Sequence, residues 1–457
     1  MKHIHFIGIG GTGLSAIAKV LLEEGYKVSG SDLTMSTLTD AVQEAGGNVF
    51  LGHQAENIQG ADIVVRSSAV LEENVEVKAA LAANIPVLKR SEFLGRLMEG
   101  KEVIAVAGSH GKTTTTSMIT WILSALDKDP SFIVGGVVAN LNTNAKAGKG
   151  SDFVIEADEY DYMFLGLNPS LAVVTNVEHD HPDIFPTEEI FRDAFRSFVN
   201  KLKPDGILVL CGEDPGAMQL QAELKPAQQL VVYGFQAPNR DYIALNLENN
   251  ENGGISFEVS AGTDTQKEPV QIALKIPGKH NVLNALAAYA VAEKIGLSGA
   301  KIGRALSEFE GSERRFDIRG EYRGIMLIDD YAHHPTEIEA TLSAARDSYP
   351  DRRIWAVWQP HTYSRTQTLF SGFTEVFSQA DQVIVLDVYA AREEKPADFS
   401  IIELVNEIDH PNVHFIPENE KAYEFLLKEL QTGDLLLIFT AGDAIDINVQ
   451  LERSLSA

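Results

Sequence analysis

The sequence has very little cysteine, no long hydrophobic run and a shortage of basic side chains. Its one cysteine, Cys211, cannot form an internal disulfide, so a reducing compartment is expected. Cys211 follows the apolar run 207–210, which predicts a buried thiol at the end of a strand. No apolar run reaches the roughly 18 residues of a transmembrane helix, and the first residues lack a signal-peptide pattern. These absences predict a soluble, cytoplasmic protein.

The charge balance narrows the classes of partner. The chain has 38 Lys and Arg against 65 Asp and Glu, a formal net charge of −27. Such a charge repels nucleic acid and anionic membranes, so neither is expected as a partner, whereas a nucleotide-sized ligand remains possible. A length of 457 residues exceeds one hydrophobic core and predicts about three domains.

A phosphate-binding loop is the strongest local signal. The β-branched run 103–107 is followed by Gly108-Ser109-His110-Gly111-Lys112-Thr113 and then by the helical run 114–126. Glycines that free backbone N–H groups, a helix N-terminus, a lysine and a hydroxyl are the parts of a site for phosphate and Mg²⁺. Val106 occupies the position of the first glycine of the G-x-x-x-x-G-K-[ST] pattern, so this loop is a shortened variant. An ordinary strand-to-helix turn with a solvated lysine is the alternative.

Carboxylates and histidines follow two later strands. The strand 152–155 leads into Glu156-Ala157-Asp158-Glu159-Tyr160-Asp161. Beside a phosphate loop, Mg²⁺ can balance the charge of such acids by binding one or two carboxylates together with phosphate oxygens. Glu156, the first acid after the strand, is the expected ligand. The strand 171–175 leads into 176–182, where His179 and His181 with two acids suggest a second cation or phosphate site. A solvated acidic loop and a histidine-capped turn are the respective alternatives.

The N-terminal region resembles a dinucleotide-binding unit. A strand at 3–9 is followed by Gly8-x-Gly10-x-x-Gly13 and a helix at 14–23, and Asp32 ends the next strand. Alone this pattern indicates a phosphorylated ligand at a helix N-terminus but does not identify it as NAD. Ser67 and Ser68 follow the strand 62–66 and are expected in the same crevice, with simple turn capping as the alternative.

The rest of the chain gives coarser predictions. The small, amide-rich run 135–142 predicts a loop that closes over a ligand, and 230–276 predicts an antiparallel flap. His280, Asn281 and Asn284 share the start of a helix at 282–295, where they either face one ligand or cap the helix. A third α/β unit follows, with a helix expected at 367–378. Polar groups collect after two of its strands, namely Asp329, Asp330, His333, His334, Gln359, His361 and Arg365.

Eight motifs together resemble one family, the Mur ligases of peptidoglycan synthesis. They are HFIGIGGTGLS, AGSHGKTTTT, EADEYD, TNVEHDH, GKHNVLNALAA, ERRFD, DDYAHHPTEI and QPHTYSRT, and they span the whole chain in order. The resemblance implies an α/β fold of three domains, Rossmann-like over 1–97, a P-loop-type ATPase over 98–312 and Rossmann-like again over 313–457. It also replaces NAD by a uridine diphosphate sugar as the ligand of the first domain.

The resemblance assigns roles to individual residues. The UDP-sugar would contact Gly10, Gly11, Thr12, Gly13, Asp32, Ser67, Ser68 and His110. ATP would contact Gly108, Ser109, His110, Gly111, Lys112, Thr113, Thr114, His280, Asn281, Asn284, Arg315 and Asp330. One Mg²⁺ would take Thr113 and Glu156, a second would take His181, and the amino acid would meet His333, His361 and Arg365. Lys112, His333 and Arg365 would be catalytic, with His333 taking the amine proton because an unperturbed pKa of roughly 6.5 suits that task.

Two features depart from the family pattern. No lysine is identifiable as the carbamoylated residue that many relatives have at the second metal. Thr362 follows His361 where some members have arginine, which leaves amino-acid recognition at this position open.

The implied reaction is ATP-dependent joining of L-alanine to the lactyl carboxylate of UDP-N-acetylmuramate through an acyl phosphate, by a monomer or homodimer. The nearest alternative attaches a ready-made tripeptide to the same sugar nucleotide. An NAD-dependent oxidoreductase would leave Lys112, Glu156 and His181 without a role. A nucleotide-gated switch without catalysis is a third alternative.

Overall fold

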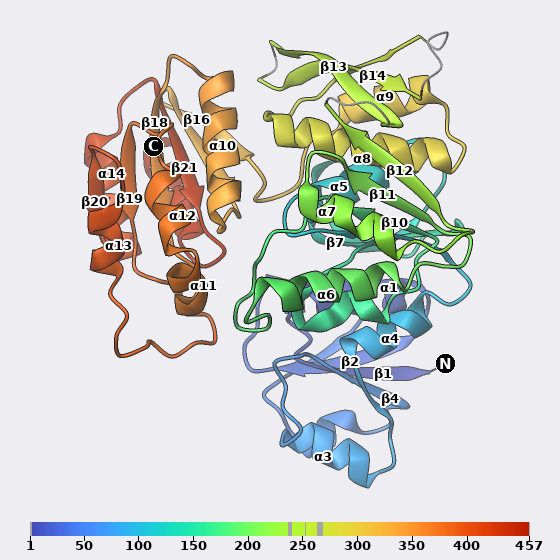
Figure 1. Cartoon of the computed structure of the whole chain (residues 1–457). Helices are drawn as coiled ribbons and strands as arrows, with labels where there is room; N and C mark the ends of the chain where they lie inside the picture. Colours follow the sequence, from blue (N-terminus) through green and yellow to red (C-terminus); the bar gives the residue numbers. More distant parts are fainter. Residues whose placement is uncertain (1, 236–239, 252, 263–267, 457) are drawn as a thin grey trace. The chain divides into compact units, whose positions relative to one another are not determined.

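The computed structural model describes residues 2–235, 240–251, 253–262 and 268–456. Its strands form three sheets, which follow one another along the chain in the colour order of Figure 1. The chain divides into two compact units. Unit 1 comprises Met1–Glu178, Arg192–Ile243 and Ala285–Ala305, and unit 2 comprises His179–Phe191, Ala244–Asn284 and Leu306–Ala457.

The N-terminal sheet is parallel throughout, with strand order β3-β2-β1-β4-β5. Its strands are β1 (His3–Ile7), β2 (Lys27–Asp32), β3 (Asn48–Leu51), β4 (Ile63–Arg66) and β5 (Val87–Lys89). The connecting helices are α1 (Thr12–Glu23), α2 (Thr37–Glu44), η1 (Ala55–Ile58), α3 (Val75–Ala82) and α4 (Arg90–Leu97). Figure 1 shows this sheet between α1 and α4 on one side and α3 on the other. Side chains alternate accordingly, because Phe6 meets Phe93 of α4 while Ile7 packs with Val77 of α3.

The central sheet positions the phosphate-binding loop at its middle. Within unit 1 its order is β12-β11-β10-β6-β9-β7-β8, parallel except for the β7–β8 pair. The strands are β6 (Glu102–Ala107), β7 (Ser131–Val138), β8 (Thr143–Lys146), β9 (Asp152–Glu156), β10 (Leu171–Val174), β11 (Ile207–Cys211) and β12 (Gln229–Gly234). Helices of this part of the chain are α5 (Lys112–Ala125), η2 (Ala139–Leu141), η3 (Tyr160–Gly166), α6 (Glu188–Val199), α7 (Pro215–Gln219), η4 (Leu220–Glu223), α8 (Lys279–Lys294) and α9 (Gly299–Glu308).

Cys211 is the last residue of β11 and is 3% exposed, which confirms the prediction of a buried thiol at a strand end.

Two predictions for this region are wrong. The run 135–142 is not one loop, because Gly135–Val138 complete β7, which pairs antiparallel with β8 across a register shift. The flap is not antiparallel throughout, since β12 pairs parallel with β11, and β13 (Tyr242–Asn249) pairs parallel with β12 through Tyr242 and Ile243. β14 (Ile255–Ala261) and β15 (Val270–Ala273) form an antiparallel pair, as expected. Residues 236–239, 252 and 263–267 of the predicted flap lie outside the described residues.

The C-terminal sheet belongs to unit 2 and has the order β16-β17-β21-β18-β19-β20. Only the β16–β17 pair in it is antiparallel. Its strands are β16 (Asp317–Tyr322), β17 (Ile325–Asp330), β18 (Arg353–Trp358), β19 (Gln382–Val385), β20 (Val413–Phe415) and β21 (Asp434–Phe439). Its helices are α10 (Pro335–Ser348), α11 (Tyr363–Thr368), α12 (Phe370–Glu375), α13 (Ile401–Glu407), α14 (Asn419–Glu429) and α15 (Ile445–Ser456). The single helix predicted at 367–378 is therefore wrong, because α11 and α12 meet at Leu369.

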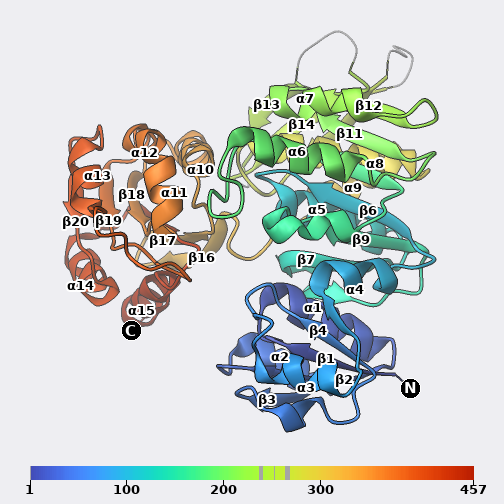
Figure 2. The same cartoon turned by 60° about the horizontal axis from the view of Figure 1, so that its bottom comes forward.

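Two hydrophobic cores cover the two faces of this sheet. Ile338, Phe373 and Leu404 of α10, α12 and α13 pack on one face, and Leu426 and Leu451 of α14 and α15 pack on the other. Figure 2 shows the same division, with α10 to α13 above the strands and α14 and α15 below. The sheet with helices on both faces is the Rossmann-like arrangement that the family resemblance implies for this region.

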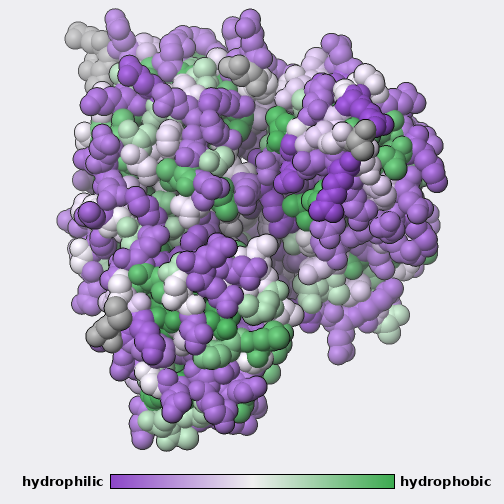
Figure 3. All heavy atoms as spheres, turned by 180° about the vertical axis from the view of Figure 1, so that it is seen from behind, coloured by the Kyte–Doolittle hydropathy of each residue, from purple (hydrophilic) through white to green (hydrophobic). Residues whose placement is uncertain are grey.

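The face in Figure 3 is mostly hydrophilic, with hydrophobic groups scattered between hydrophilic side chains. Among the described residues, no helix combines the length and apolar character that a membrane crossing requires. The predicted domain boundaries fall between sheets, one at the end of α4 before β6 and the other just before β16.

Candidate functional site

The phosphate-binding loop has the predicted strand–loop–helix order. β6 ends at Ala107, and α5 begins at Lys112 with Gly111 as its N-cap at φ 77°. Gly108 has φ 141°, and a Cβ at that position would lie 1.9 Å from the Thr175 hydroxyl. Both conformations favour glycine, so the loop depends on these two residues for its shape.

Lys112 lies where the loop turns into the helix. Its Nζ donates to the carbonyl oxygens of Gly108 (2.5 Å) and Ser109 (3.0 Å) and forms an ion pair with Glu159 Oε1 at 2.9 Å. Burial opposes the charge of the ammonium, but the carboxylates of Glu159 and Asp158 outweigh it and raise the pKa of Lys112. Lys112 is therefore a fixed cation beside the N-terminus of α5.

Thr113 and Glu156, two of the three predicted metal ligands, lie side by side. The Thr113 hydroxyl donates to Glu156 Oε1 at 3.0 Å, and Gly135 N donates to Glu156 Oε2 at 2.7 Å. A hydroxyl and a carboxylate at the edge of a phosphate loop are hard oxygen donors, so the residues present fit Mg²⁺. His181, the third predicted ligand, belongs to unit 2.

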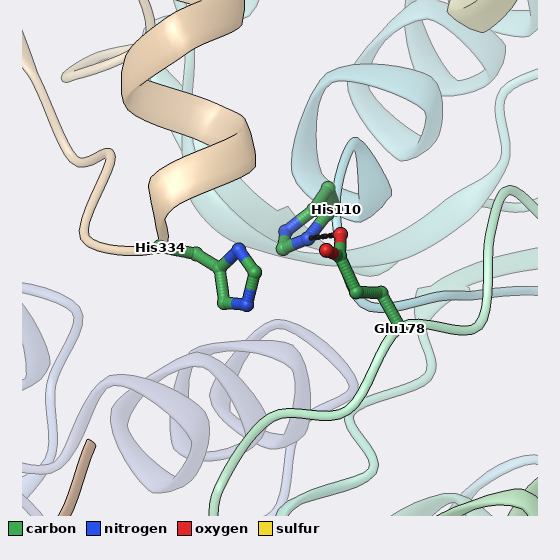
Figure 4. A group of neighbouring side chains, drawn as sticks. All are labelled: His110, Glu178 and His334. Atoms are coloured by element: carbon green, nitrogen blue, oxygen red, sulfur yellow. Dashed lines mark hydrogen bonds and ion pairs between the residues drawn. The ribbon is translucent and has the colours of Figure 1, made fainter. Parts of the chain in front are cut away.

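His110 is held on its side chain and its backbone by one strand-end segment. Its Nε2 lies 2.9 Å from Glu178 Oε2, the pair drawn with a dashed line in Figure 4. Asn176 Oδ1 accepts from His110 N at 2.8 Å, and the Thr175 hydroxyl donates to His110 O at 2.6 Å. The motif after β10 thus fixes the conformation of the phosphate-binding loop.

Figure 4 also draws His334. His334 is the N-cap of α10, and its Nδ1 accepts from Thr336 N at 3.3 Å.

The N-terminal glycine loop is held by Asp32. Gly10 N donates to Asp32 Oδ2 at 2.8 Å, so this carboxylate binds the loop backbone as well as lying at a strand end. A Cβ on Gly8 (φ 83°) would lie 3.0 Å from Ser67 Cβ, which places Ser67 beside the loop, whereas Ser68 is exposed.

Arg90 approaches the same loop and has no counterpart among the predicted residues. A Cβ on Gly13 would lie 2.2 Å from Arg90 Nη1, and Arg90 Nη2 forms an ion pair with Asp158 at 3.1 Å. A guanidinium beside a glycine-rich helix start suits an anionic ligand. No local motif marks Arg90 in the sequence.

Unit 2 brings together Asp180, His181, His333, His361 and Arg365. Arg365 Nε donates to Asp180 Oδ1 at 2.8 Å, and both side chains are 4% exposed. Arg365 Nη1 donates to His361 Nδ1 (2.9 Å), and its Nη2 donates to His181 Nδ1 (3.2 Å). A guanidinium has no acceptor, so both histidine Nδ1 atoms carry a lone pair here.

The charges in this cluster are unequal. Burial opposes ionisation of Asp180, but His181, Arg365 and His333 outweigh it and hold its pKa well below the usual range. Burial, reinforced by Arg365, lowers the pKa of His361 to about 4 and that of His333 well below its ordinary value. At neutral pH the cluster contains a buried Asp180–Arg365 ion pair beside the neutral imidazoles of His333 and His361. The sequence predicted an unshifted pKa for His333, and the burial of its ring is the reason for the difference.

His333 has one ring nitrogen available as a proton acceptor. Its Nδ1 donates to the Tyr331 carbonyl at 2.9 Å, which leaves Nε2 as the basic atom, 4.0 Å from Asp180 Oδ2.

Asp330 and Arg315 lie near each other at the end of β17. Asp330 accepts from Phe316 N (2.9 Å) and Ala332 N (2.7 Å), and burial raises its pKa to about 6. The Arg315 guanidinium lies over the Tyr331 ring at 5.0 Å. In this structure Asp330 joins the two chain segments on either side of β17, and its contact with ATP stays a prediction.

The residues at the start of α8 make local contacts. Asn281 Nδ2 donates to Pro277 O at 2.6 Å, and Asn284 Nδ2 donates to Asn281 Oδ1 at 3.1 Å. Burial lowers the pKa of His280 to about 4. These contacts secure the turn before α8, and a ligand contact for the three residues stays a prediction.

Two of the residues that sequence reasoning missed are acids inside recognised motifs. Glu159 pairs with Lys112, and Asp180 pairs with Arg365. Both motifs were noted, but a run of acids does not show which member faces inward. That information comes from the turn geometry after each strand.

Three family models match the chain in succession. Residues 3–102 match the Mur ligase family catalytic domain, 106–292 the Mur ligase middle domain and 314–442 the Mur ligase glutamate ligase domain. Curated relatives match almost the whole length. The UDP-N-acetylmuramate–L-alanine ligase of Syntrophomonas wolfei is 42% identical over 98% of this chain and 96% of its own. That of Desulforamulus reducens is 43% identical over 99% and 98%.

Solved structures give the same picture. The UDP-N-acetylmuramate–alanine ligase of Thermotoga maritima superposes with a TM-score of 0.81 at 28% identity, covering 100% of both chains. A murein peptide ligase from Psychrobacter arcticus gives a TM-score of 0.74 at 26% identity, covering 100% of this chain and 99% of its own. The predicted three-domain α/β fold is confirmed by the first superposition.

Proposed function

The chain belongs to the Mur ligase family, and on that premise we propose that it joins L-alanine to the lactyl carboxylate of UDP-N-acetylmuramate at the expense of ATP. The observation that carries this proposal is the set formed by Lys112, Thr113 and Glu156 on the glycine loop between β6 and α5. Relatives named for this reaction, at 42–43% identity over nearly the full length, support the choice of substrates.

The three parts of the chain have separate tasks in this proposal. Residues 1–97 hold the UDP-sugar through the glycine loop, Asp32, Ser67 and Ser68. Residues 98–312 hold ATP on the phosphate loop, with His280, Asn281 and Asn284 toward the adenine. Residues 313–457 bring the amino acid to His333, His361 and Arg365, and contribute Arg315 and Asp330 to the nucleotide.

Activation of the carboxylate is the first chemical step. A carboxylate resists attack by an amine until its oxygen becomes a leaving group, and phosphorylation to an acyl phosphate achieves this. Lys112 is held at the loop by Glu159, where its charge offsets that of the transferring phosphoryl group. Thr113 and Glu156 would hold one Mg²⁺ and His181 a second, and these ions would neutralise charge on the phosphate oxygens.

Amide formation is the second step. The amine must lose a proton before it attacks, and the neutral Nε2 of His333 is the acceptor in this proposal. Because burial lowers the pKa of His333, the ring is neutral at pH 7 and can accept a proton, but it is a weaker base than a free imidazole and releases that proton readily. Arg365, fixed by Asp180, supplies the positive charge for a carboxylate of the amino acid.

The cellular setting follows from the substrates and the composition. The substrates are small molecules, of which ATP and the sugar nucleotide are phosphorylated, and the one thiol is buried. The net charge of −27 disfavours nucleic acid and membrane surfaces. We place the reaction in the cytoplasm, carried out by a monomer or homodimer.

One assay tests the proposal and its nearest alternative. Purified protein receives ATP, Mg²⁺ and UDP-N-acetylmuramate, and phosphate release is measured with free L-alanine or with the peptide L-alanyl-γ-D-glutamyl-meso-diaminopimelate as acceptor. We expect release with L-alanine. Faster release with the tripeptide would favour a murein peptide ligase, whose solved example also superposes on this chain. No release with either acceptor would contradict both.

Lys112→Ala serves as the first variant in this assay. We expect turnover to fall by at least about 100-fold, because a fixed cation at the transferring phosphoryl group is lost. Binding of UDP-N-acetylmuramate, measured by calorimetry, should stay near the wild-type value. Retained turnover would contradict the assignment of the phosphate loop.

A further inference from the structure

A carboxylate is buried in the N-terminal sheet region, away from the residues discussed above. Glu76, in the first turn of α3, is 0% exposed and faces the strands of the sheet. The β1 side chains that point to this face are His3, His5 and Ile7, by the alternation that also places Ile7 against α3. An ionised carboxylate in such a place requires several donors.

Both oxygens of Glu76 are fully used. Oε2 accepts from the Ser31 hydroxyl at 2.7 Å and from His5 Nε2 at 3.2 Å. Oε1 accepts from Asn57 Nδ2 at 2.6 Å and from Gln54 N at 3.1 Å. Burial alone would raise the pKa of Glu76, but these hydrogen bonds outweigh burial and lower it. Glu76 is therefore an anion that joins β1, β2 and the segment after β3.

Ser31 connects this anion to the glycine loop. While its hydroxyl donates to Glu76, its carbonyl accepts from Gly8 N at 2.8 Å and Ile9 N at 3.1 Å. The next residue, Asp32, accepts from Gly10 N at 2.8 Å. The backbone of Gly8 to Gly10 is thus held by two consecutive residues of β2.

The segment after β3 is tied to the same strand end. Gly52 N donates to Asp32 O at 2.7 Å, and Asn57 Nδ2 contacts both Gly52 O (3.1 Å) and Glu76. His53 Nδ1 lies 2.9 Å from the Ser31 hydroxyl. The end of β2 is therefore fixed from both sides by groups that converge on Glu76.

We propose that Glu76 is a positioning residue for the sugar-nucleotide site, acting through Ser31 on the loop formed by Gly8 to Gly13. Glu76 itself is too deeply buried to touch a ligand. This inference rests on the proposed function, because it assumes that the loop binds the diphosphate of the UDP-sugar. Second-layer hydrogen bonds of this kind set the geometry of the groups that contact a ligand.

The test compares Glu76→Gln, Ser31→Ala and the control Glu73→Gln, which changes an exposed acid two residues before α3 begins at Val75. Steady-state kinetics give kcat and the separate KM values for UDP-N-acetylmuramate and ATP. Calorimetry with UDP-N-acetylmuramate gives binding without turnover, and urea unfolding reports stability. Glu76→Gln replaces one accepting oxygen by an NH₂ group that faces existing donors, so the hydrogen bonds to that atom must break.

We expect Glu76→Gln to raise KM for UDP-N-acetylmuramate about 10-fold and to leave kcat and KM for ATP within about 2-fold of wild type. Ser31→Ala should raise the same KM about 3-fold, since the carbonyl that holds the loop remains. The double variant should resemble Glu76→Gln alone, because both changes interrupt one connection.

Three results would overturn the inference. An unchanged KM for the sugar nucleotide in Glu76→Gln would show that the loop does not depend on this residue. Parallel changes in kcat and in both KM values would show a general loss of structure. Additive effects in the double variant would show that Glu76 and Ser31 act on the site independently. Failure of the wild-type protein itself to bind UDP-N-acetylmuramate would instead refute the proposed function, and the inference with it.

Discussion

At the scale of single residues, buried carboxylates take opposite charge states according to their neighbours. Asp180 keeps its charge because Arg365 donates to it at 2.8 Å. Asp329 is at least as deeply buried, but Asn448 Nδ2 at 2.7 Å is its hydrogen-bond donor, and Arg319 Nε lies 3.7 Å away. Burial therefore raises the pKa of Asp329 to about 6.

This shift predicts a pH-dependent stability. Between the unfolded pKa of about 3.9 and the folded value, the native state binds a proton that the unfolded state lacks, so stability falls as pH rises through this window. An asparagine at position 329 does not ionise, so Asp329→Asn removes this pH-dependent loss of stability. We expect its free energy of unfolding in urea, relative to wild type, to increase by about 3 kcal/mol from pH 4 to pH 7 and then to level off.

The exposed acid Asp398 provides the control, since Asp398→Asn should give a difference that does not vary with pH. A flat difference for Asp329→Asn over the same range would show that Asp329 is ionised throughout.

Glu156 gives a prediction about the metal. Its carboxylate faces the Thr113 hydroxyl at 3.0 Å, and Glu156→Gln keeps its size while removing the charge that Mg²⁺ requires. We expect the Mg²⁺ concentration for half-maximal turnover to rise about 10-fold or more. Glu73→Gln is the control. If the Mg²⁺ titration of Glu156→Gln matched that of this control, Glu156 would not be a metal ligand and would only hold the loop.

At the scale of elements, the sequence predicted best the structures that depend on residues close together in the chain. The strand, glycine loop and helix around Lys112 were placed correctly, and so was the adjacency of Thr113 and Glu156, because parallel strand ends share one edge of a sheet. The parallel pairing of β13 with β12 was not predicted, because strand pairing is a non-local property that alternation in the sequence does not encode. Gly135 and Gly136 concealed β7 for a different reason, since their composition favours loops.

The same limit applies to the site. Lys112 was identified from its loop, but its partner Glu159 depends on η3, where Asp161 and Tyr162 have positive φ. Arg365 was identified from its motif, whereas its ion pair with Asp180 joins positions 185 residues apart. Pairings of this kind require the tertiary structure.

The conformation of the phosphate-binding loop gives a prediction at this scale. Gly108→Ala would place a Cβ 1.9 Å from the Thr175 hydroxyl at φ 141°, so the loop must shift. We expect the Kd for ATP to rise at least about 10-fold, because backbone N–H groups leave their positions. Calorimetry with Mg-ATP measures it.

Gly100→Ala is the matched control, because Gly100 has φ 81° and its Cβ would meet nothing within 4 Å. It should cost about 1 kcal/mol of stability from backbone strain alone and leave ATP binding intact. Equal ATP affinities for the two variants would contradict a special role for Gly108.

At the scale of the whole molecule, the acidic composition acts on stability. A net charge of −27 favours expanded states through self-repulsion, while isolated surface ion pairs contribute little. Screening weakens interactions between exposed charges beyond about 10 Å at 0.1 M salt.

We therefore expect the Tm to rise by a few degrees when NaCl increases from about 20 mM to 500 mM at pH 8. Differential scanning fluorimetry measures the change, and matched sucrose samples control for osmotic effects. A fall in Tm would mean that attractive ion pairs outweigh the net repulsion.

The sealed position of Cys211 has a further consequence. With its only sulfhydryl 3% exposed at the end of β11, the chain offers thiol-directed dyes almost no native target, and burial also raises the pKa of that sulfhydryl. If one cysteine is introduced on the surface of each unit, the dyes will react with these two cysteines and not with Cys211. Energy transfer between two such dyes would report movement of the units as nucleotide, sugar and amino acid are added in turn.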